Sequence, residues 1–293
     1  MDNLAISFSG GRTSAVMTDI LLKKFPDREI EITFANTGLE HSDTLRFVND
    51  CDNSLFGGKV VWLEAVVDPE HGKGIRHKIV SFETAARNGE PYRDAVEKYG
   101  LFNPTSPSCT TRTKVEPMES YLKTKGFFRG KKLNYETAIG IRADEIDRIS
   151  EMHKEQGLIY PLAELGYRKR DVKEYCKKWD FDLKIPEHYG NCVGCWKKTF
   201  RKLATVSKEI PASFDFWRKI ESDFKSFKQE NNHDLDTGYR RIFRDQKTVD
   251  DIFQIANRPD FKPYSDIDDQ QSEFGWMDLG GSCGDSCEVY SDE

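Results

Sequence analysis

A glycine turn between a strand and a helix, at residues 9–14, constrains the fold of this chain more than any other feature. An apolar run at 4–9 predicts the strand, and apolar residues at helical spacing predict the helix over 14–24. The turn consists of Ser9, Gly10, Gly11, Arg12, Thr13 and Ser14. Glycines let a backbone close around an anion, and a helix N-terminus favours pyrophosphate there. The sequence therefore predicts a phosphate-binding loop, with a tight turn that binds nothing as the alternative.

Beyond this turn, strands and helices continue to alternate. Strands are predicted at 30–35, 59–67, 135–141 and 158–160, and helices at 42–50, 116–125 and 169–179. This order predicts an α/β fold, doubly wound around a mostly parallel sheet, with a C-terminal helical region. Residues 68–113 interrupt the alternation with polar residues, Gly and Pro, and are expected to form an irregular or helical insertion over the sheet edge.

The predicted domains are a nucleotide-binding α/β domain at 1–205, with the insertion at about 68–113, then a helical extension at 206–259 and an acidic tail at 260–293. Beyond Cys195, helices are expected at 200–206 and 214–227. From residue 260 onward there are ten acidic residues and one basic residue, so the tail is expected to be mobile. No apolar run approaches the roughly 20 residues of a membrane helix, and a cytoplasmic protein without membrane contact is expected.

Residues 1–259 are mildly basic, with 43 Lys and Arg against 40 Asp and Glu. The bases cluster at 112–132 and again at 168–202. Such clusters predict contact with a nucleotide or with a nucleic-acid backbone, and solvated helix faces are the alternative.

The glycine turn also resembles a known loop. It lacks the Gly-Lys-Ser/Thr ending of a Walker A loop, so phosphoryl transfer from the γ position is not predicted. Its pattern Ser-Gly-Gly-x-Thr-Ser is similar to the PP-loop, or adenine nucleotide α-hydrolase, superfamily. The resemblance implies that Ser9, Gly10, Gly11, Thr13 and Ser14 hold the β,γ-pyrophosphate of ATP while a nucleophile attacks the α-phosphorus.

Further segments resemble the phosphoadenosine phosphosulfate reductase family over residues 3 to 205. They are Phe34-Ala35-Asn36-Thr37-Gly38 followed by Glu40 and Thr44, then Gly140-Ile141-Arg142-Ala143-Asp144-Glu145, then Tyr160-Pro161-Leu162 and Arg170-Asp171-Val172. The resemblance implies that Phe34, Asn36, Thr37, Gly38 and Gly140 bind the nucleotide. It also implies that Arg12 and Arg142 act as catalytic cations on the phosphate charge. Taken singly, an ordinary turn at 37–38 and a surface pair of Arg142 with Glu145 are alternatives.

Three of the seven cysteines form a candidate metal site. Cys192 and Cys195 make a Cys-x-x-Cys pair, and Cys109 precedes a base-rich segment. The set resembles the iron-sulfur branches of the superfamily, including tRNA 2-thiocytidine synthetases and DNA phosphorothioation proteins, which implies a three-ligand 4Fe-4S cluster. Zinc with a fourth ligand from His188 or a tail cysteine, and thiols without metal, stay open. Cys51 and Cys176 are expected to be packed side chains.

These features predict an enzyme that binds ATP with Mg2+ and adenylylates a substrate oxygen. Sulfur held at the cluster would then displace AMP and enter a nucleic acid or a small molecule, which requires a sulfur donor. The alternative is a phosphoadenosine phosphosulfate or adenylyl sulfate reductase, with Cys283 and Cys287 as catalytic thiols and a thioredoxin-like reductant; the Glu-Cys-Gly-Leu-His ending of those reductases is absent. A non-catalytic nucleotide sensor is a third hypothesis. Whether the chain forms a homodimer stays open.

Overall fold

A six-stranded sheet forms the centre of the computed structural model, which describes residues 3–70, 72–128, 134–224 and 241–265. The strands are β1 (Asn3–Ser7), β2 (Glu29–Ala35), β3 (Val60–Val67), β4 (Ile75–Val80), β5 (Tyr135–Ala138) and β6 (Leu158–Ile159). Their order across the sheet is β4-β3-β2-β1-β5-β6, and only the β3–β4 pair is antiparallel. The mostly parallel sheet predicted from the sequence is confirmed.

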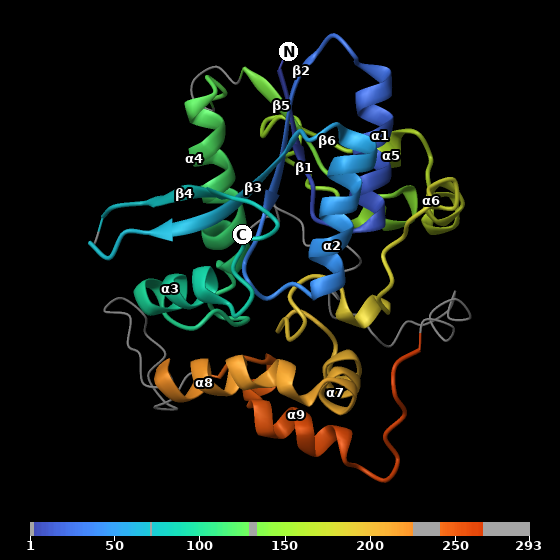
Figure 1. Cartoon of the computed structure of the whole chain (residues 1–293). Coiled ribbons are helices and arrows are strands. Elements are labelled where there is room, and N and C mark those ends of the chain that lie inside the picture. Colours follow the sequence, from blue (N-terminus) through green and yellow to red (C-terminus); the bar gives the residue numbers. More distant parts are fainter. Residues whose placement is uncertain (1–2, 71, 129–133, 225–240, 266–293) are drawn as a thin grey trace.

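Helices cover both faces of this sheet (Figure 1). The helices that accompany the strands are α1 (Arg12–Lys24), α2 (Ser42–Cys51), α3 (Glu90–Tyr99), α4 (Glu116–Thr124), α5 (Pro161–Glu164) and α6 (Lys169–Cys176). One core joins residues of β1 and β2 to α1, α2 and α6, and another joins β1, β2 and β3 to α4. The fold is therefore doubly wound, as predicted, because each face of the sheet buries apolar side chains against helices of its own.

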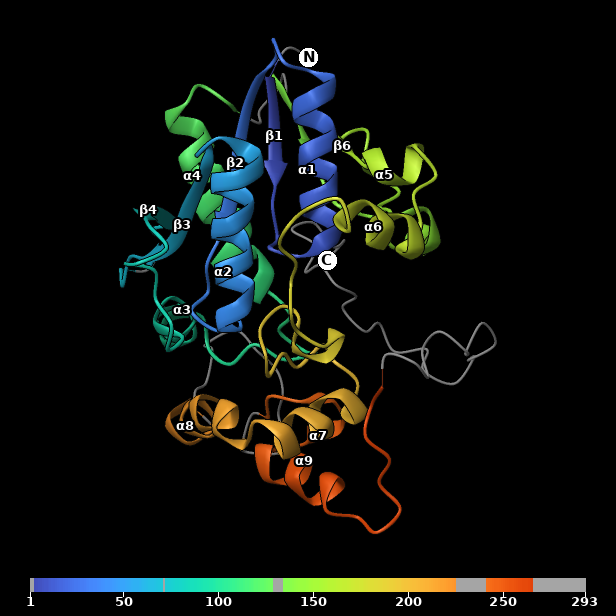
Figure 2. The same cartoon turned by 45° about the vertical axis from the view of Figure 1, so that its right-hand side comes forward.

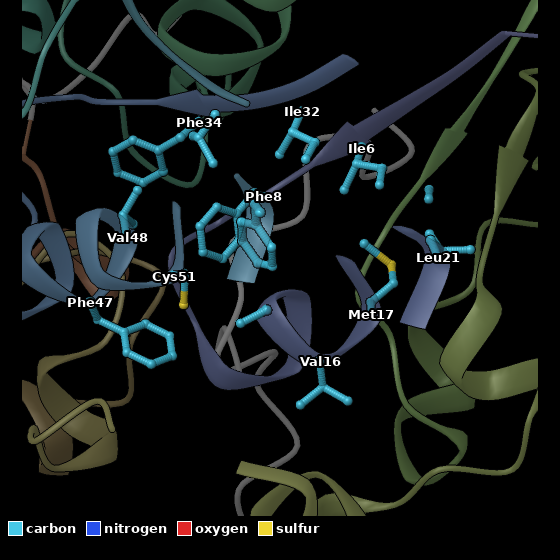
Figure 3. Packing of buried hydrophobic residues seen from close by; sticks show 14 of the residues in the cluster. Ile6, Phe8, Val16, Met17, Leu21, Ile32, Phe34, Phe47, Val48 and Cys51 are labelled. Carbon is cyan, nitrogen blue, oxygen red and sulfur yellow. The ribbon is translucent and has the colours of Figure 1, made fainter. Parts of the chain in front are cut away.

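The core behind the glycine turn shows why the turn lies where it does. Figure 3 shows Phe8 and Phe34 beside Val48 of α2, with Val16 and Met17 of α1 close by. All five side chains are at most 1% exposed. Since both ends of the turn are fixed by buried apolar residues, the polar residues between them are held at the carboxyl edge of the sheet.

Residues 75–80 correct the sequence analysis. They form β4 at the edge of the sheet, where we expected an irregular or helical insertion, and α3 follows within the same segment. The strand was missed because three consecutive polar residues, Arg76, His77 and Lys78, interrupt its apolar ones, and Arg76 and Lys78 are exposed. An edge strand tolerates such residues because one side of it has no neighbour in the sheet.

A second layer of helices lies beneath the carboxyl ends of the strands (Figure 2). It consists of α7 (Phe200–Glu209), α8 (Asp215–Phe224) and α9 (Val249–Ala256), which share a core with α3. Short helical turns lie at Asp52–Phe56, Thr111–Val115, Ala143–Arg148, Glu187–Tyr189, Pro211–Phe214 and Arg244–Gln246. The domain boundary expected at residue 205 falls inside α7. Among the described residues, no helix has the length and apolar character needed to cross a membrane.

Candidate functional site

The order of the strands reverses direction between β1 and β5. The chain adds β2 and β3 on one side of β1, and β5 and β6 on the other. The chain segments that follow β1 and β5 therefore continue toward opposite edges of the sheet. Open α/β sheets bind ligands at the carboxyl ends of the strands where the order reverses in this way. The two loops touch here, since a Cβ on Gly140 would lie 3.0 Å from Cα of Ser14. The predicted phosphate loop and the predicted Arg142 segment thus form one site.

The phosphate loop has a backbone that requires its first glycine. Gly10 has a φ of 80°, and a Cβ there would lie 2.9 Å from methyl groups of both Thr44 and Val48. Gly11 is the N-cap of α1, and the first turn of this helix has neither a side-chain cap nor an acidic residue. The amides at this helix N-terminus therefore suit an anion.

The serine hydroxyls fold the loop onto itself. Ser14 Oγ donates to the Gly11 carbonyl at 3.0 Å and accepts from the Ser9 amide at 3.2 Å. Ser9 Oγ lies 3.0 Å from the same oxygen. These hydrogen bonds join Ser9, Gly11 and Ser14 in one closed loop. The sequence shows that the three residues are near one another along the chain, but it does not show these bonds.

Arg142 is buried between this loop and two acidic residues. Its side chain is 8% exposed, and Nη1 donates to Thr13 Oγ1 at 3.1 Å. Its Nε donates to Asp144 at 3.0 Å, and Nη1 lies 3.4 Å from Glu145. A surface pair with Glu145, the alternative from the sequence, is wrong because the guanidinium is buried against the loop. Its positive charge is placed beside the hydroxyl of Thr13.

Arg12 points away from the loop toward a segment far along the chain. Its Nε and Nη2 donate to the two oxygens of Asp182 at 2.7 and 3.0 Å, and Nη2 also donates to the Leu183 carbonyl. Burial opposes ionisation of Asp182, but the Arg12 guanidinium keeps the pKa of that carboxyl below its ordinary value. The predicted contact of Arg12 with phosphate would therefore require exchange with Asp182, a partner that no local pattern in the sequence indicates.

Phe34 and Asn36 serve the fold at the carboxyl end of β2. The Phe34 ring is buried 4.8 Å from the Trp62 ring. Asn36 Nδ2 donates to Glu64 at 2.8 Å and to the Ala86 carbonyl at 2.9 Å. Phe34 and Asn36 are two of the residues that the resemblance assigned to the nucleotide. In this structure the contacts of their side chains hold the turn that follows β2.

That turn connects the nucleotide motif to the cysteines. Thr37 Oγ1 donates to the Glu40 carboxylate at 2.8 Å and lies 3.4 Å from Cys192 Sγ. The Val193 amide donates to the Leu39 carbonyl at 3.0 Å, so the Cys-x-x-Cys segment runs along the turn. Gly38, with a φ of 78°, has no room for a Cβ beside the loop at residue 89. The two predicted sites are therefore neighbours.

Cys109, Cys192 and Cys195 line one cavity, together with Tyr92, Lys114 and Trp217. Burial, followed by the nearby Glu40 carboxylate, raises the pKa of the Cys192 thiol. Burial and the same three cysteines also raise the pKa of Tyr92. The structure thus brings Cys109 to the Cys192–Cys195 pair, which lies more than 80 residues further along the sequence.

The three thiols of this cavity are donors that both an iron-sulfur cluster and zinc accept. Within the described residues, no three His, Cys, Asp or Glu side chains are arranged to hold a metal ion. The cavity measures about 20 Å3, so a bound cluster would require its walls to separate. His188 does not line it, and its Nε2 instead lies 2.6 Å from Glu209.

The remaining cysteines divide into two groups. Cys51 and Cys176 are buried in the main core, as predicted, and burial raises the pKa of both thiols. Cys283 and Cys287, the predicted redox thiols, lie outside the described residues. The structure therefore places only Cys109, Cys192 and Cys195 beside the nucleotide motif.

The sequence analysis quoted Glu40 in a motif without giving it a role, and it did not name Trp217. The Glu40 side chain is 2% exposed and lies 3.9 Å from Lys114, which places a buried ion pair next to Cys192. A Cβ on Gly194 would meet the buried indole of Trp217 at 2.1 Å, so only glycine fits between the two cysteines. The spacing Thr-x-x-Glu could have indicated Glu40, because this pattern commonly caps a turn. Nothing near Gly194 in the sequence indicates Trp217.

A buried carboxylate stabilises the segment before the cysteines. Glu187 accepts from Lys169 and Lys202 at 2.7 Å each, and despite burial these lysines lower its pKa from 4.5 to about 2. Replacing Glu187 by Gln is expected to lower the free energy of unfolding by about 3 kcal/mol at pH 7, because Lys202 stays buried without its partner. Urea titrations of both proteins measure this difference.

The difference in free energy of unfolding between the wild type and Glu187→Gln is expected to depend on pH. A depressed pKa stabilises the native state above pH 4.5, and this contribution is lost as pH falls through about 2. The gap between the wild type and Glu187→Gln should therefore narrow progressively below pH 5. Glu174→Gln, which removes an exposed pair with Lys177, is the control and should change stability by less than about 0.5 kcal/mol. A gap that is constant down to pH 3 would contradict the assignment.

Comparison with known proteins places the chain in a family. Residues 3–200 match the phosphoadenosine phosphosulfate reductase domain. A relative described as an uncharacterized nin region protein of Escherichia phage lambda is 30% identical over 291 residues, which are 97% of this chain and 94% of that protein. An uncharacterized protein of Methanocaldococcus jannaschii is 23% identical over 245 residues, or 78% of this chain and 42% of that protein.

Two solved structures are also similar. A phosphoadenylyl-sulfate reductase from Candida auris, in a phosphate complex, is 18% identical and matches 61% of this chain and 73% of its own with a TM-score of 0.37. A U34-tRNA thiolase from Methanococcus maripaludis with its 4Fe-4S cluster is 16% identical and matches 78% of this chain and 74% of its own with a TM-score of 0.34. From the match over residues 3–200 and the lambda relative, the chain belongs to the phosphoadenosine phosphosulfate reductase domain family.

Proposed function

We propose that this protein cleaves ATP between the α and β phosphates and adenylylates an oxygen of a substrate, as the first step of sulfur transfer to a nucleic acid or a small molecule. One observation carries the proposal. A glycine loop without a side-chain cap begins α1 at the reversal of strand order, and the buried Arg142 closes it through Thr13. This arrangement suits a pyrophosphate group held next to a fixed positive charge.

The chemistry follows from the position of that charge. The β and γ phosphates bind the amides of the loop and the hydroxyls of Ser9 and Thr13, with Mg2+ as counter-ion. The substrate oxygen forms a bond to the α-phosphorus, the bond from the α-phosphorus to the bridging oxygen breaks, and pyrophosphate leaves with that electron pair. Arg142 stabilises the negative charge that develops there, and Arg12 joins it when it exchanges Asp182 for phosphate.

The second step replaces the activated oxygen. A hydrosulfide nucleophile forms a bond to the carbon that bears the adenylylated oxygen, the carbon-oxygen bond breaks, and AMP leaves with this oxygen and its electron pair. Cys109, Cys192 and Cys195 would hold an iron-sulfur cluster, which supplies an iron able to bind sulfur. Thr37 contacts Cys192 and so holds the cysteine segment against the nucleotide motif.

The products formed from ATP test this proposal. Protein purified without oxygen, incubated with ATP, Mg2+, sulfide and candidate acceptors, is expected to release AMP and pyrophosphate, which chromatography separates. Gly140→Ala should reduce this release by at least about tenfold, since each 1.4 kcal/mol is tenfold and the new methyl presses on the backbone of Ser14. Gly74→Ala, at a position with open space, is the matched control. ADP as the sole product would contradict cleavage at the α-phosphorus.

A sulfonucleotide reductase is the second candidate, and membership of the family favours it. The same loop would then bind the nucleotide of phosphoadenylyl sulfate or adenylyl sulfate. This candidate predicts sulfite release in the presence of thioredoxin, and loss of that activity in Cys283→Ser or Cys287→Ser. The two candidates can be separated in one preparation, because AMP with pyrophosphate supports adenylylation and sulfite supports reduction.

A further inference from the structure

A cavity of about 560 Å3 lies beside the phosphate loop and shares only Arg12 with the nucleotide motifs. Its walls come from α6, from the segment 179–190 and from Arg12. Because Arg12 is the first residue of α1, the cavity adjoins the place where the proposed function puts the phosphates of ATP. The volume falls within the range of pockets that bind small ligands, and one nucleotide fits in it.

The charges on the cavity wall favour an anionic occupant. Five basic side chains and three acidic ones line it. Asp182 is paired with Arg12, and Glu187 with Lys169. Beyond these pairs the wall carries the exposed bases Lys173, Lys177 and Lys184 and the exposed acid Asp180, so its net charge is positive. The exposed bases Arg168, Arg170 and Lys178 continue the positive region along and beyond α6. A chain of phosphates can therefore contact lysines both at the rim and outside it.

Two aromatic rings complete the wall. Trp179 and Phe181 stack with their centroids 5.8 Å apart and their planes 14° apart, and both are half-buried. Phe181 also packs on Phe47, which holds the pair against the main core. A fixed aromatic platform bordered by lysines is the arrangement that binds bases and phosphates of a single strand. An acidic peptide would use the lysines and would gain little from the rings.

We propose that this cavity receives one nucleotide of a single-stranded nucleic acid, which is the acceptor of the proposed reaction. The base lies against Trp179 and Phe181, and the flanking phosphates contact Lys173, Lys177 and Lys184. The inference rests on the proposed function, because Arg12 connects the cavity to the phosphate loop and so brings an oxygen of the base near the α-phosphorus. A duplex is excluded, since a paired base cannot enter a cavity of this kind without leaving its stack.

Fluorescence anisotropy with labelled 20-residue oligonucleotides tests the proposal, using one sequence as single-stranded RNA, single-stranded DNA and duplex. The double variant Lys173→Glu/Lys184→Glu should bind the preferred single strand at least about 30-fold more weakly at 150 mM salt, with a salt slope reduced by about two. The double variant Lys59→Glu/Lys73→Glu, with the same change of charge near the opposite sheet edge, should bind within about threefold of the wild type.

The aromatic platform needs a separate variant. Trp179→Ala should weaken binding by about tenfold and leave the salt slope unchanged, while Trp179→Phe keeps most of the affinity. Equal binding by the lysine variant and the wild type, or equal binding of duplex and single strand, would overturn the proposal. An acidic peptide that competes as well as the oligonucleotide would also overturn it. Release of AMP and pyrophosphate is measured separately, so lysine-dependent binding without ATP cleavage rejects only the proposed function.

Discussion

Replacement of Arg142 by alanine is expected to weaken ATP binding by about 100-fold or more, which corresponds to about 2.7 kcal/mol. The guanidinium is buried and donates to Thr13 in the phosphate loop. Its removal leaves Asp144 without this partner and Glu145 with Arg148 alone, so the charge beside the loop becomes more negative and phosphate is attracted less. Isothermal titration calorimetry with a non-hydrolysable ATP analogue measures the affinity of each protein.

Two further variants separate binding from folding. Arg142→Lys keeps the charge and loses the planar fork, so an intermediate loss of about tenfold is expected. Arg28→Ala is the matched control, because Arg28 forms a partly buried pair with Glu136 at 2.6 Å, on β5. Its loss should lower stability by a comparable amount and leave ATP affinity unchanged. Wild-type affinity in Arg142→Ala would show that the phosphate loop works without this cation.

Replacement of Cys192 by alanine is expected to remove iron from protein isolated without oxygen, from about four atoms per chain to fewer than one. Cys192 is buried, its thiol has a raised pKa, and it lies between Thr37 and the other two cysteines of the cavity. A buried thiolate forms only when metal compensates its charge, so loss of one ligand exposes the remaining two to protonation. Iron and sulfide analysis with visible absorption spectra measures the content.

The other cysteines provide the comparison. Cys109→Ala and Cys195→Ala should lose iron to the same extent, and Cys176→Ala, which changes a thiol of the main core, should retain it. Iron loading should also raise the unfolding temperature of the wild type and not that of Cys192→Ala, because metal that binds only the native state stabilises it. One zinc per chain, or iron content unaffected by Cys192→Ala, would contradict a cluster at this cavity.

The fold could be predicted over most of the α/β domain because its signals are local. Apolar runs marked β1, β2 and β3, and helical spacing marked α1 and α2, all within a few residues of their observed ends. Strand β4 was missed because its pairing with β3 determines its conformation, and three consecutive polar residues at 76–78 interrupt its apolar ones. Helix α9 was not predicted, although Thr248 and Asp251 form a capping box in front of apolar residues at helical spacing.

Some residues of the candidate site lie where the sequence predicted, and others have a different role. The resemblance identified the loop at 9–14, Arg142 and the three cysteines, and the structure brings Arg142 to Thr13 and the cysteines to one cavity. The resemblance also assigned Phe34 and Asn36 to the nucleotide, and both side chains are engaged in holding the fold. The order of residues in a motif cannot show which side of a strand faces the ligand, because the packing of the sheet decides this.

By itself, the sequence determined the glycine loop, the alternation around it and the family, because backbone conformation at glycine and the period of apolar residues are properties of short segments. Only the tertiary structure decided the partners of the functional side chains. Arg12 meets Asp182 from 170 residues away, and Thr37 meets Cys192 from 155 residues away. Such contacts exist only after the sheet and its helices have packed, since packing fixes distances that the chain leaves free.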